Sequence, residues 1–476
     1  MSIVKQSSKY SLKELILNTR LLKIKLYYLN QIFIRQMNKA EQLVERRKNI
    51  VPRGVAIFNP ATVSSAKGAV IIDANGKEMI DFAGGIGVLN AGHCPAPVVK
   101  AIQAQAEKLI HACFHVATYE PYVELAEELA SLFPHGEKTK VMLTNTGAES
   151  VENAIKIARQ ATKRHAVICF SGAFHGRTMM AMTLTSKVDY KLSCGPFAPE
   201  VYRFPFPNVY KNGNGLSEED FSKRELQNFR KALANSVAPQ TVAAVIIEPV
   251  QGEGGFNVVP KAYLKGLREI CDEYGIMLII DEVQSGFART GKWAAYQHFD
   301  IIPDLSTWAK SMGSGMPIGC VIGKQEIMDA AAPGTIGGTY LGNPLSCAAA
   351  LATIQYMKDT NLNARAIEIG EIVNNRFKAL QKKCKAIGDV RGLGAMNAFE
   401  LVLNNDPKQP DANITAQLLR NCFERGLVIL AAGTFRNVIR ILSPLVITDQ
   451  QLHKGLDIIE EELLKLTAIA ELEPVS

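Results

Sequence analysis

Two apolar runs on either side of a helical pattern decide the fold: "TVAAVIIEPV" (residues 241–250) and "GIMLIIDEV" (residues 275–283). Each run is almost continuously apolar, which predicts a strand buried on both faces of a sheet. Between them, "YLKGLREICDEY" (residues 263–274) has the apolar spacing of an amphipathic helix. Two strands joined by a helix are typical of an α/β fold with a mostly parallel sheet between helices.

The same alternation extends along the chain. Residues 140–160, "KVMLTNTGAESVENAIKIARQ", predict a strand, a turn and a helix, and "HAVICF" (residues 165–170) predicts a further strand. From residue 365 onward the pattern changes to long helices and short strands, such as "RNVIRILSPLVI" (residues 436–447). This change predicts a second, smaller α/β domain.

Composition limits the function classes. The chain has 476 residues, of which 47% are hydrophobic and 21% charged, as in ordinary globular proteins. Its nine cysteines include no C-x-x-C pair, which argues against a disulfide framework or zinc ribbon and favours the reducing cytoplasm. The chain contains no run of about 18 uncharged apolar residues, so its sequence predicts no membrane span.

The net charge of +7 is concentrated at the N-terminus. Residues 1–36 contain seven Lys or Arg and one acid, so they carry +6 of it. The nearly neutral remainder has no basic patch typical of nucleic-acid binding. Because Met37 opens a stretch that resembles a natural protein start, we expect residues 1–36 to be an extension that activity does not need. A targeting or membrane-surface segment is the alternative, since such segments are basic and poor in acids.

Several predicted strands end in polar residues. "VIIEPVQGEGG" supplies Glu248 and Glu253, "LIIDEVQSG" supplies Asp281 and Gln284, and "TNTGAES" (residues 144–150) supplies a glycine turn at a helix start. In open α/β sheets, ligands bind beyond the carboxyl ends of the strands. We therefore expect these groups to meet at one edge of the sheet.

The glycine turn, an acid and a lysine suggest one cofactor. The bare N–H groups of Gly147 and Ala148 at a helix start would bind an anion, although Thr146 and Glu149 also have the spacing of a simple capping box. Asp281 is either a turn acid or a buried carboxylate that needs a cationic partner. Lys310, in "TWAKSMGSGMPIG" (residues 307–319), has no acid in its immediate sequence, and a lysine in such a low-dielectric pocket becomes nucleophilic. Together the three match the requirements of pyridoxal 5'-phosphate (PLP).

Two motifs contain histidine. "HACFH" (residues 111–115) has metal-ligand spacing on a possible helix, but no third ligand is evident, so we expect a structural role and no metal site. "GAFHGRT" (residues 172–178) follows a strand, and its Arg177 is suited to bidentate anion binding.

From about Met37 to about Leu464 the chain resembles the class III, fold type I, PLP-dependent aminotransferases. The resemblance rests on the ordered motifs "LTNTGAESVENAIKIAR", "FHGRT", "IIEPVQGEGG", "IIDEVQSGFARTGKW", "PDLSTWAKSMGSGMPIG", "GGTYLGNPLSCAAA" and "RILSPL". It implies a large PLP-binding domain (residues 91–350) with a seven-stranded sheet. The small domain would combine residues 37–90 and 351–476.

The resemblance also implies a role for each matching residue. Lys310 would hold the cofactor covalently and later carry the proton, and Asp281 would pair with the pyridinium nitrogen. The other implied contacts are Gly147 and Ala148 to the phosphate, Val283 and Phe174 on the two ring faces, Gln284 to the phenolic oxygen, His175 and Glu248 near the ring, and Thr339 to the phosphate of a neighbouring subunit. The last contact implies a homodimer or a dimer of dimers.

The implied substrates are a small amino donor and a 2-oxo acid. "DFAGGIGVLNAGH" (residues 81–93) and "NTGAESVENAIK" (residues 145–156) are most similar to 4-aminobutyrate aminotransferases. In that pattern Ile86 lines the substrate channel and Arg177 holds the distal carboxylate. Arg440 holds the α-carboxylate of glutamate, and Glu253 covers Arg440 when the substrate lacks that group. A static Glu253–Arg440 pair is the simpler alternative.

Other activities on the same fold remain open. Acetylornithine, ornithine, putrescine or 5-aminovalerate would be alternative donors, and a PLP decarboxylase or racemase would need no 2-oxoglutarate. Two residues depart from the resemblance or lack a role: Ser314 replaces a glycine, and Arg436 adds a positive charge near Arg440.

Overall fold

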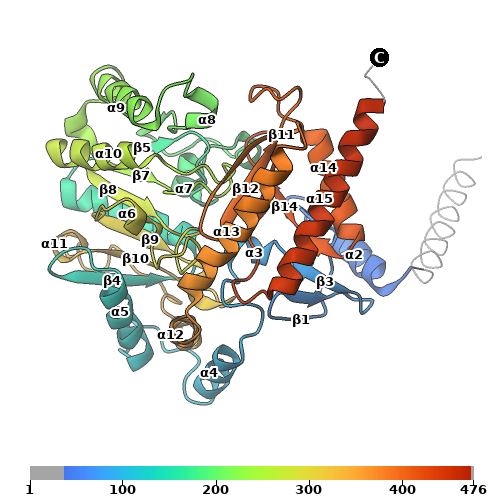
Figure 1. Ribbon diagram of the computed structural model, residues 1–476. Coiled ribbons are helices and arrows are strands. Elements are labelled where there is room, and N and C mark those ends of the chain that lie inside the picture. Colours follow the sequence, from blue (N-terminus) through green and yellow to red (C-terminus); the bar gives the residue numbers. More distant parts are fainter. Residues whose placement is uncertain (1–36, 473–476) are drawn as a thin grey trace, which may run out of the picture. The chain divides into compact units, whose positions relative to one another are not determined.

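The computed structural model describes residues 37–472, and they divide into two compact units (Figure 1). The smaller unit comprises the described chain up to Ser65 together with Ile71–Met79; the larger comprises Ala66–Val70 and the chain from Ile80. The proposed extension, residues 1–36, lies outside the described residues. The smaller unit contains α2 (Lys39–Ile50), which begins with a capping box between Asn38 and Glu41. The chain crosses the boundary between the two units within each of three short strands: β1 (Ser65–Lys67), β2 (Val70–Ile72) and β3 (Glu78–Asp81).

The larger unit is built on a seven-stranded sheet, as predicted. Its spatial order is β4 (Thr139–Thr144), β10 (Gly319–Lys324), β9 (Leu305–Trp308), β8 (Met277–Asp281), β7 (Val242–Ile247), β5 (Ala166–Phe170) and β6 (Val201–Phe204). Only β10 is antiparallel to its neighbours, β4 and β9. The mostly parallel sheet confirms the α/β prediction.

Both faces of this sheet are covered by helices, which explains the unbroken apolar runs. In β7, Ala244 and Ile246 belong to the apolar cluster on the α6 face, whereas Val245 and Ile247 belong to the cluster on the α10 face. The helices of the α6 face are α6 (Gly147–Thr162), α7 (Met179–Leu184) and α11 (Gln325–Met328). The helices that pack with the other cluster include α5 (Glu120–Leu132), α9 (Glu218–Asn235) and α10 (Lys261–Tyr274).

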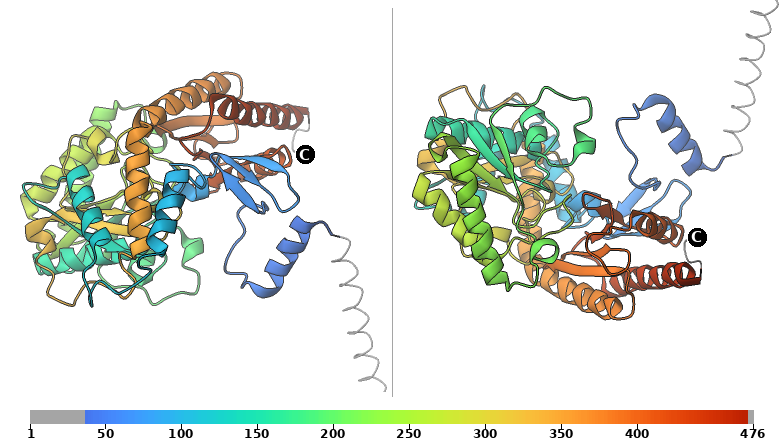
Figure 2. Two further views of the ribbon diagram at one scale, coloured as in Figure 1. Left: turned by 90° about the horizontal axis from the view of Figure 1, so that it is seen from below. Right: turned by 90° about the horizontal axis from the view of Figure 1, so that it is seen from above.

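Two helices far apart in sequence, α4 (Ala96–Ala106) and α12 (Pro344–Asp359), pack side by side (Figure 2). The short elements between the main ones are α3 (Gly84–Gly87), α8 (Val209–Asn212), and the 3₁₀ turns η1 (Val188–Tyr190), η2 (Pro239–Thr241), η3 (Ala295–His298) and η4 (Lys310–Gly313).

The C-terminal part has the expected long helices and short strands. An antiparallel sheet has the order β11 (Ile387–Leu393), β12 (Met396–Leu401), β15 (Val438–Ile441) and β14 (Leu430–Ala432). Its helices are α13 (Leu362–Gln381), α14 (Ala412–Glu424) and α15 (Asp449–Leu472), and β13 (Leu427–Val428) pairs in parallel with β3 through Ile80 and Asp81. The proposed domain boundaries at residues 90 and 350 stay a prediction.

A buried arginine ties three segments of the larger unit together. Arg289 is 0% exposed, and its guanidinium donates to Oδ1 of Asn90 and to the backbone carbonyls of Ala395 and Ser443. Its partners are neutral oxygens, so the buried charge is satisfied by hydrogen bonds rather than by a carboxylate. Among the described helices, none combines the length and apolarity needed to cross a membrane.

Candidate active site

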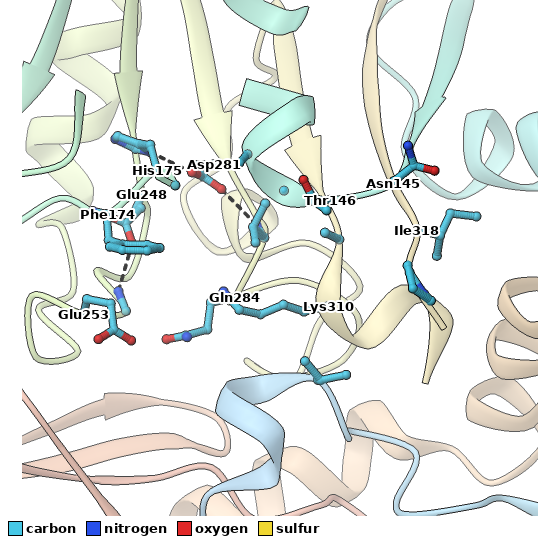
Figure 3. A pocket seen from close by; sticks show the side chains of 18 of the residues that line it. Asn145, Thr146, Phe174, His175, Glu248, Glu253, Asp281, Gln284, Lys310 and Ile318 are labelled. Atoms are coloured by element: carbon cyan, nitrogen blue, oxygen red, sulfur yellow. Dashed lines mark hydrogen bonds and ion pairs between the residues drawn. The ribbon is translucent and has the colours of Figure 1, made fainter. Parts of the chain in front are cut away.

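A cavity of about 370 Å³ lies beyond the carboxyl ends of β7 and β8, where the predicted residues were expected to meet (Figure 3). Its lining includes the predicted residues Gly147, Ala148, Phe174, His175, Glu248, Glu253, Asp281, Val283, Gln284 and Lys310. Segments more than 160 residues apart in the sequence therefore contribute to one site.

The start of α6 forms one wall of this cavity. Thr146 caps the helix by accepting a hydrogen bond from the N–H of Glu149 at 3.2 Å. The reciprocal half of the predicted capping box is shifted by one residue, because the Glu149 carboxylate accepts from the N–H of Asn145 at 2.7 Å. A Cβ on Gly147 would lie 2.8 Å from a methyl carbon of Val283. Glycine therefore lets Val283 pack closely against the start of α6.

The acids beyond β7 and β8 are buried. Asp281 is 4% exposed, and its Oδ2 lies 2.6 Å from Nδ1 of His175. Glu248 accepts hydrogen bonds from the N–H groups of Phe174 (3.0 Å) and Gly252 (2.9 Å). Burial, reinforced by the charge of Asp281 and opposed by His175, raises the pKa of Glu248 to about 7. Glu248 thus fixes the two loops on which Phe174 and Glu253 lie.

Lys310 enters the cavity from the turn after β9. Its backbone has φ of 49°, in the left-handed region that residues other than glycine rarely adopt. The surrounding protein lowers the pKa of Lys310 by desolvation, although the carboxylates of Asp281, Glu253 and Glu248 act in the opposite direction. Figure 3 shows its side chain running toward Gln284, with Asp281 above both in this view. The amine is therefore suited to act as a nucleophile or to accept a proton.

Ser314 ends the same turn and also has a left-handed backbone, with φ of 46°. A glycine would adopt this conformation without strain, which accounts for the glycine in the resemblance pattern. The Ser314 hydroxyl forms a hydrogen bond of 3.1 Å with the hydroxyl of Thr353 on α12. Serine thus gains one contact to the helix beneath the turn.

The two arginines lie beside the cavity rather than in its lining. Arg177 is exposed, and its Cζ lies 4.5 Å from the ring centroid of Tyr190 and 5.9 Å from that of Phe174. Arg440, on β15, is 3% exposed, and its Nη1 lies 2.5 Å from Oε1 of Glu253. Burial alone would raise the pKa of Glu253, but the Arg440 charge and hydrogen bond outweigh it and lower that pKa.

Ile86 and Thr339 also fall outside the lining. The carbonyl of Ile86, in the tight turn α3, accepts from Nε2 of Gln284 at 3.3 Å. Thr339 is exposed on the loop before α12, and its contact with a neighbouring subunit stays a prediction. Arg436 forms an exposed ion pair of 2.9 Å with Asp189 of η1.

The "HACFH" segment does not form the helix that its histidine spacing allowed. Cys113 has φ of 60°, and Phe114 stacks on the ring of Tyr122 at 3.8 Å between centroids. This aromatic packing replaces the helical turn that would have placed the two histidines on one face. Sequence reasoning also missed Tyr190, because no motif distinguishes it from the other tyrosines.

The residues present fit PLP. An anion fits the helix start, the Asp281 carboxylate fits a protonated ring nitrogen, and the Lys310 amine fits an aldehyde. Gln284 lines the cavity, and within residues 37–472 its buried Oε1 has no hydrogen-bond partner. A bound group that donates a hydrogen bond would satisfy it.

Known proteins are similar to this chain in sequence and fold. The profile of the family "Aminotransferase class-III" matches residues 50–463. A "Probable 4-aminobutyrate aminotransferase" of Bacillus subtilis (strain 168) is 46% identical over 89% of this chain and 97% of its own length. A "5-aminovalerate aminotransferase DavT" of Pseudomonas aeruginosa is 47% identical over 88% of this chain and 97% of its own.

A solved structure extends the comparison to the cofactor. The taurine:2-oxoglutarate aminotransferase of Bifidobacterium kashiwanohense, in complex with PLP and glutamate, has a TM-score of 0.84 and 28% identity and covers 90% of this chain and 99% of that one. The fold-type prediction and the PLP prediction are thereby confirmed. The chain belongs to the class III aminotransferases, whose cofactor is pyridoxal 5'-phosphate.

Proposed function

We propose that the protein transfers the amino group of 4-aminobutyrate to 2-oxoglutarate, giving succinate semialdehyde and L-glutamate. The two substrates would react in turn, in a ping-pong sequence. The donor has one carboxylate, whereas 2-oxoglutarate and glutamate have two. The site must therefore accept ligands that differ by one negative charge at the same position.

The observation that carries this proposal is the Glu253–Arg440 pair. Arg440 is almost completely buried, so leaving it without an anion would be costly. Glu253 supplies that anion at 2.5 Å. Nothing within the described part of the chain accepts a hydrogen bond from the buried Nε of Arg440. An incoming carboxylate thus has a donor available besides the one that Glu253 uses.

The residues divide the work as follows. When bound, PLP supplies the aldehyde and the electron-accepting ring through which an amino group passes between substrates. Arg177 would bind the carboxylate distant from the reacting carbon. Glu253 would stay on Arg440 while 4-aminobutyrate reacts and would turn away when glutamate presents its α-carboxylate.

Two further groups would handle protons. The Lys310 amine would accept the proton from the reacting carbon of the substrate and return it at the other end of the transfer. Asp281 would keep a proton on the ring nitrogen, and His175 would hold the Asp281 carboxylate in place. Gly147 and Ala148 would bind the phosphate through their N–H groups. Val283 and Phe174 would enclose the ring.

A donor panel tests the proposal. The holoenzyme is given 2-oxoglutarate with each of 4-aminobutyrate, 5-aminovalerate, acetylornithine, ornithine and putrescine, and glutamate formation is measured. We expect the highest kcat/KM with 4-aminobutyrate. A clearly higher value with acetylornithine or ornithine would refute the substrate assignment. Release of CO₂ without 2-oxoglutarate would refute the reaction class.

5-Aminovalerate is the second candidate donor. The Pseudomonas aeruginosa relative that carries its name is as similar to this chain as the Bacillus subtilis relative. The donor is one methylene longer than 4-aminobutyrate and has the same end groups. Arg177 would therefore bind the carboxylate of either donor, and Glu253 would stay on Arg440 with both. A hydrophobic pocket discriminates one methylene by about 10–200-fold, so a ratio of kcat/KM values decides between them.

We also propose that the enzyme is a cytoplasmic homodimer or dimer of dimers in which Thr339 completes the neighbouring phosphate site. Sedimentation velocity gives the assembly size. Mixing Thr339→Ala subunits with Lys310→Ala subunits tests the shared site. Heterodimers should recover activity if Thr339 acts across the interface, because one of the two sites then has both residues intact.

A further inference from the structure

Tyr190 lies between the groups that contact the substrate in the proposed function. It ends η1, and its ring meets Phe174 edge to face at 5.3 Å between centroids. The guanidinium of Arg177 lies over the same ring at 4.5 Å, and the Lys187 amine lies 5.7 Å from it. These contacts fix the plane of the ring and support the Arg177 side chain, which is otherwise exposed.

The hydroxyl of Tyr190 reaches the Glu253 carboxylate. It donates to Oε2 at 3.5 Å, a long hydrogen bond, while Oε1 binds Arg440. Burial, followed by the charge of Glu253, raises the pKa of Tyr190, so the phenol keeps its proton and acts as a donor. The two oxygens of Glu253 are thus held by two different residues.

We propose that Tyr190 is a positioning residue that couples the two carboxylate-binding arginines, its ring supporting Arg177 and its hydroxyl holding Glu253 over Arg440. The inference rests on the proposed function and deepens it. A ligand with two carboxylates must displace Glu253 and so must break both of its contacts. Tyr190 therefore favours ligands with one carboxylate over ligands with two.

The cost of displacing Glu253 determines the sign of each change in affinity. A ligand shifts a two-state element only by its differential affinity for the two states, and the cost of displacing Glu253 lowers the affinity for dicarboxylates. Tyr190→Phe removes the hydroxyl and keeps the ring, so this cost falls. Tyr190→Leu removes the ring as well, so Arg177 loses its support.

The test measures binding of two unreactive ligands to the PLP-loaded enzyme by isothermal titration calorimetry. Glutarate has two carboxylates, and valerate has one on a chain of the same length. In Tyr190→Phe we expect glutarate to bind about three- to tenfold more tightly, as loss of one long hydrogen bond of ordinary net strength predicts, with valerate changed less than twofold. In Tyr190→Leu we expect valerate to bind more weakly.

Two controls make the outcome specific. Tyr202→Phe removes a hydroxyl that bonds Glu200 at 3.1 Å away from the cavity, and it should change neither affinity. In a Glu253→Ala background, Tyr190→Phe should no longer tighten glutarate, because the group that it holds is gone. Unchanged glutarate binding in Tyr190→Phe, or an equal gain in the Glu253→Ala background, would overturn the proposal.

This experiment is separate from the test of the proposed function. Neither glutarate nor valerate carries an amino group, so the result does not depend on which donor the enzyme prefers. Failure with 4-aminobutyrate in the donor panel would refute the substrate and leave the Tyr190 result standing. An unchanged glutarate-to-valerate ratio would refute the role of Tyr190 even if 4-aminobutyrate were the best donor.

Discussion

Oδ2 of Asp281 lies 2.6 Å from Nδ1 of His175, and both side chains are almost completely buried. An ionised carboxylate can only accept a hydrogen bond, so the imidazole donates through Nδ1. Oδ1 of the same carboxylate accepts from the N–H of Val283 at 3.0 Å. Asp281 is thus oriented from two sides by its own chain.

Asp281→Asn keeps the size of the side chain and removes the charge. We expect kcat for both half-reactions to fall by about 10²-fold or more, because the ring nitrogen loses the anion that keeps it protonated. Stopped-flow absorbance with glutamate measures one half-reaction directly. The control is Asp329→Asn, which breaks an exposed pair with Lys140 and should leave kcat unchanged. Full activity in Asp281→Asn would contradict the assignment.

The lowered pKa of Lys310 predicts how the apoenzyme takes up PLP. The neutral amine is the nucleophile, so the rate of covalent attachment should rise with pH to a plateau. Its midpoint should lie below the ordinary lysine value of about 10.4, because burial disfavours the charged amine. Borohydride trapping followed by mass spectrometry measures the attached fraction. A midpoint at or above the ordinary value, or label elsewhere than Lys310, would be the contrary result.

Gly147→Ala should weaken cofactor retention. The added Cβ would lie 2.8 and 2.9 Å from the two methyl carbons of Val283, so the helix start or Val283 must move. Overpacking of this size costs about 1–3 kcal/mol, which corresponds to a roughly five- to 150-fold rise in the PLP dissociation constant. Gly54→Ala is the matched control, since no atom lies within 4 Å of its new Cβ. Equal retention in both variants would show that this contact does not matter.

Glu253→Gln should separate the two half-reactions. The amide keeps the shape of the side chain but leaves the Arg440 charge uncompensated when 4-aminobutyrate is bound. We expect kcat/KM for 4-aminobutyrate to fall at least about tenfold more than kcat/KM for glutamate, as removal of one partner of a buried pair predicts. Glu273→Gln, which breaks the exposed pair with Arg230, is the control. Equal losses on both substrates would favour a static pair.

The lowered pKa of Asp304 predicts how the stability of the folded protein falls in acid. Burial alone would raise its pKa, but Arg268, Lys324 and the N–H of Leu278 outweigh it and lower that pKa. A carboxylate with a lowered pKa stabilises the folded state fully when the pH is above its pKa in the unfolded chain, about 3.9. This contribution is lost as the pH falls through its lower pKa in the folded protein.

Substitution should reveal the same contribution. Asp304→Asn should lower the stability at pH 7 by about 3 kcal/mol and reduce its dependence on pH below about 4. Asp300→Asn, which affects an exposed pair with Lys261, should change little. Differential scanning calorimetry at one scan rate measures both variants. Equal melting temperatures at pH 7 would contradict the prediction.

The sequence predicted the parallel core because the strands are buried on both faces. A run such as that of β7 has apolar residues at every position only when both faces are covered. The reversed direction of β10 was not predictable, since "GCVIGK" (residues 319–324) contains no signal for strand direction. Likewise, the non-helical conformation of "HACFH" depends on Tyr122. The local spacing of residues does not reveal the contact between Tyr122 and Phe114.

The candidate site was predictable where motifs carry the chemistry. Lys310, Asp281 and Gly147 stand in recognisable motifs, and the structure brings them around one cavity. Tyr190 stands in no such motif, and its contacts with Arg177 and Glu253 arise only from the folded chain. The His175–Asp281 contact was also missed, because it joins a loop residue and the end of β8, which are 106 residues apart in the sequence.

Arg289 has a consequence for how the enzyme should respond to acid. Its acceptors, the Asn90 amide and the carbonyls of Ala395 and Ser443, do not gain protons in the range where carboxylate pairs dissociate. The hydrogen bonds of Arg289, which join the loop after Asp281 to the turn after Ile86, therefore persist when Glu253 and Asp304 become neutral. Acid should loosen the carboxylate contacts of the site before it loosens this support.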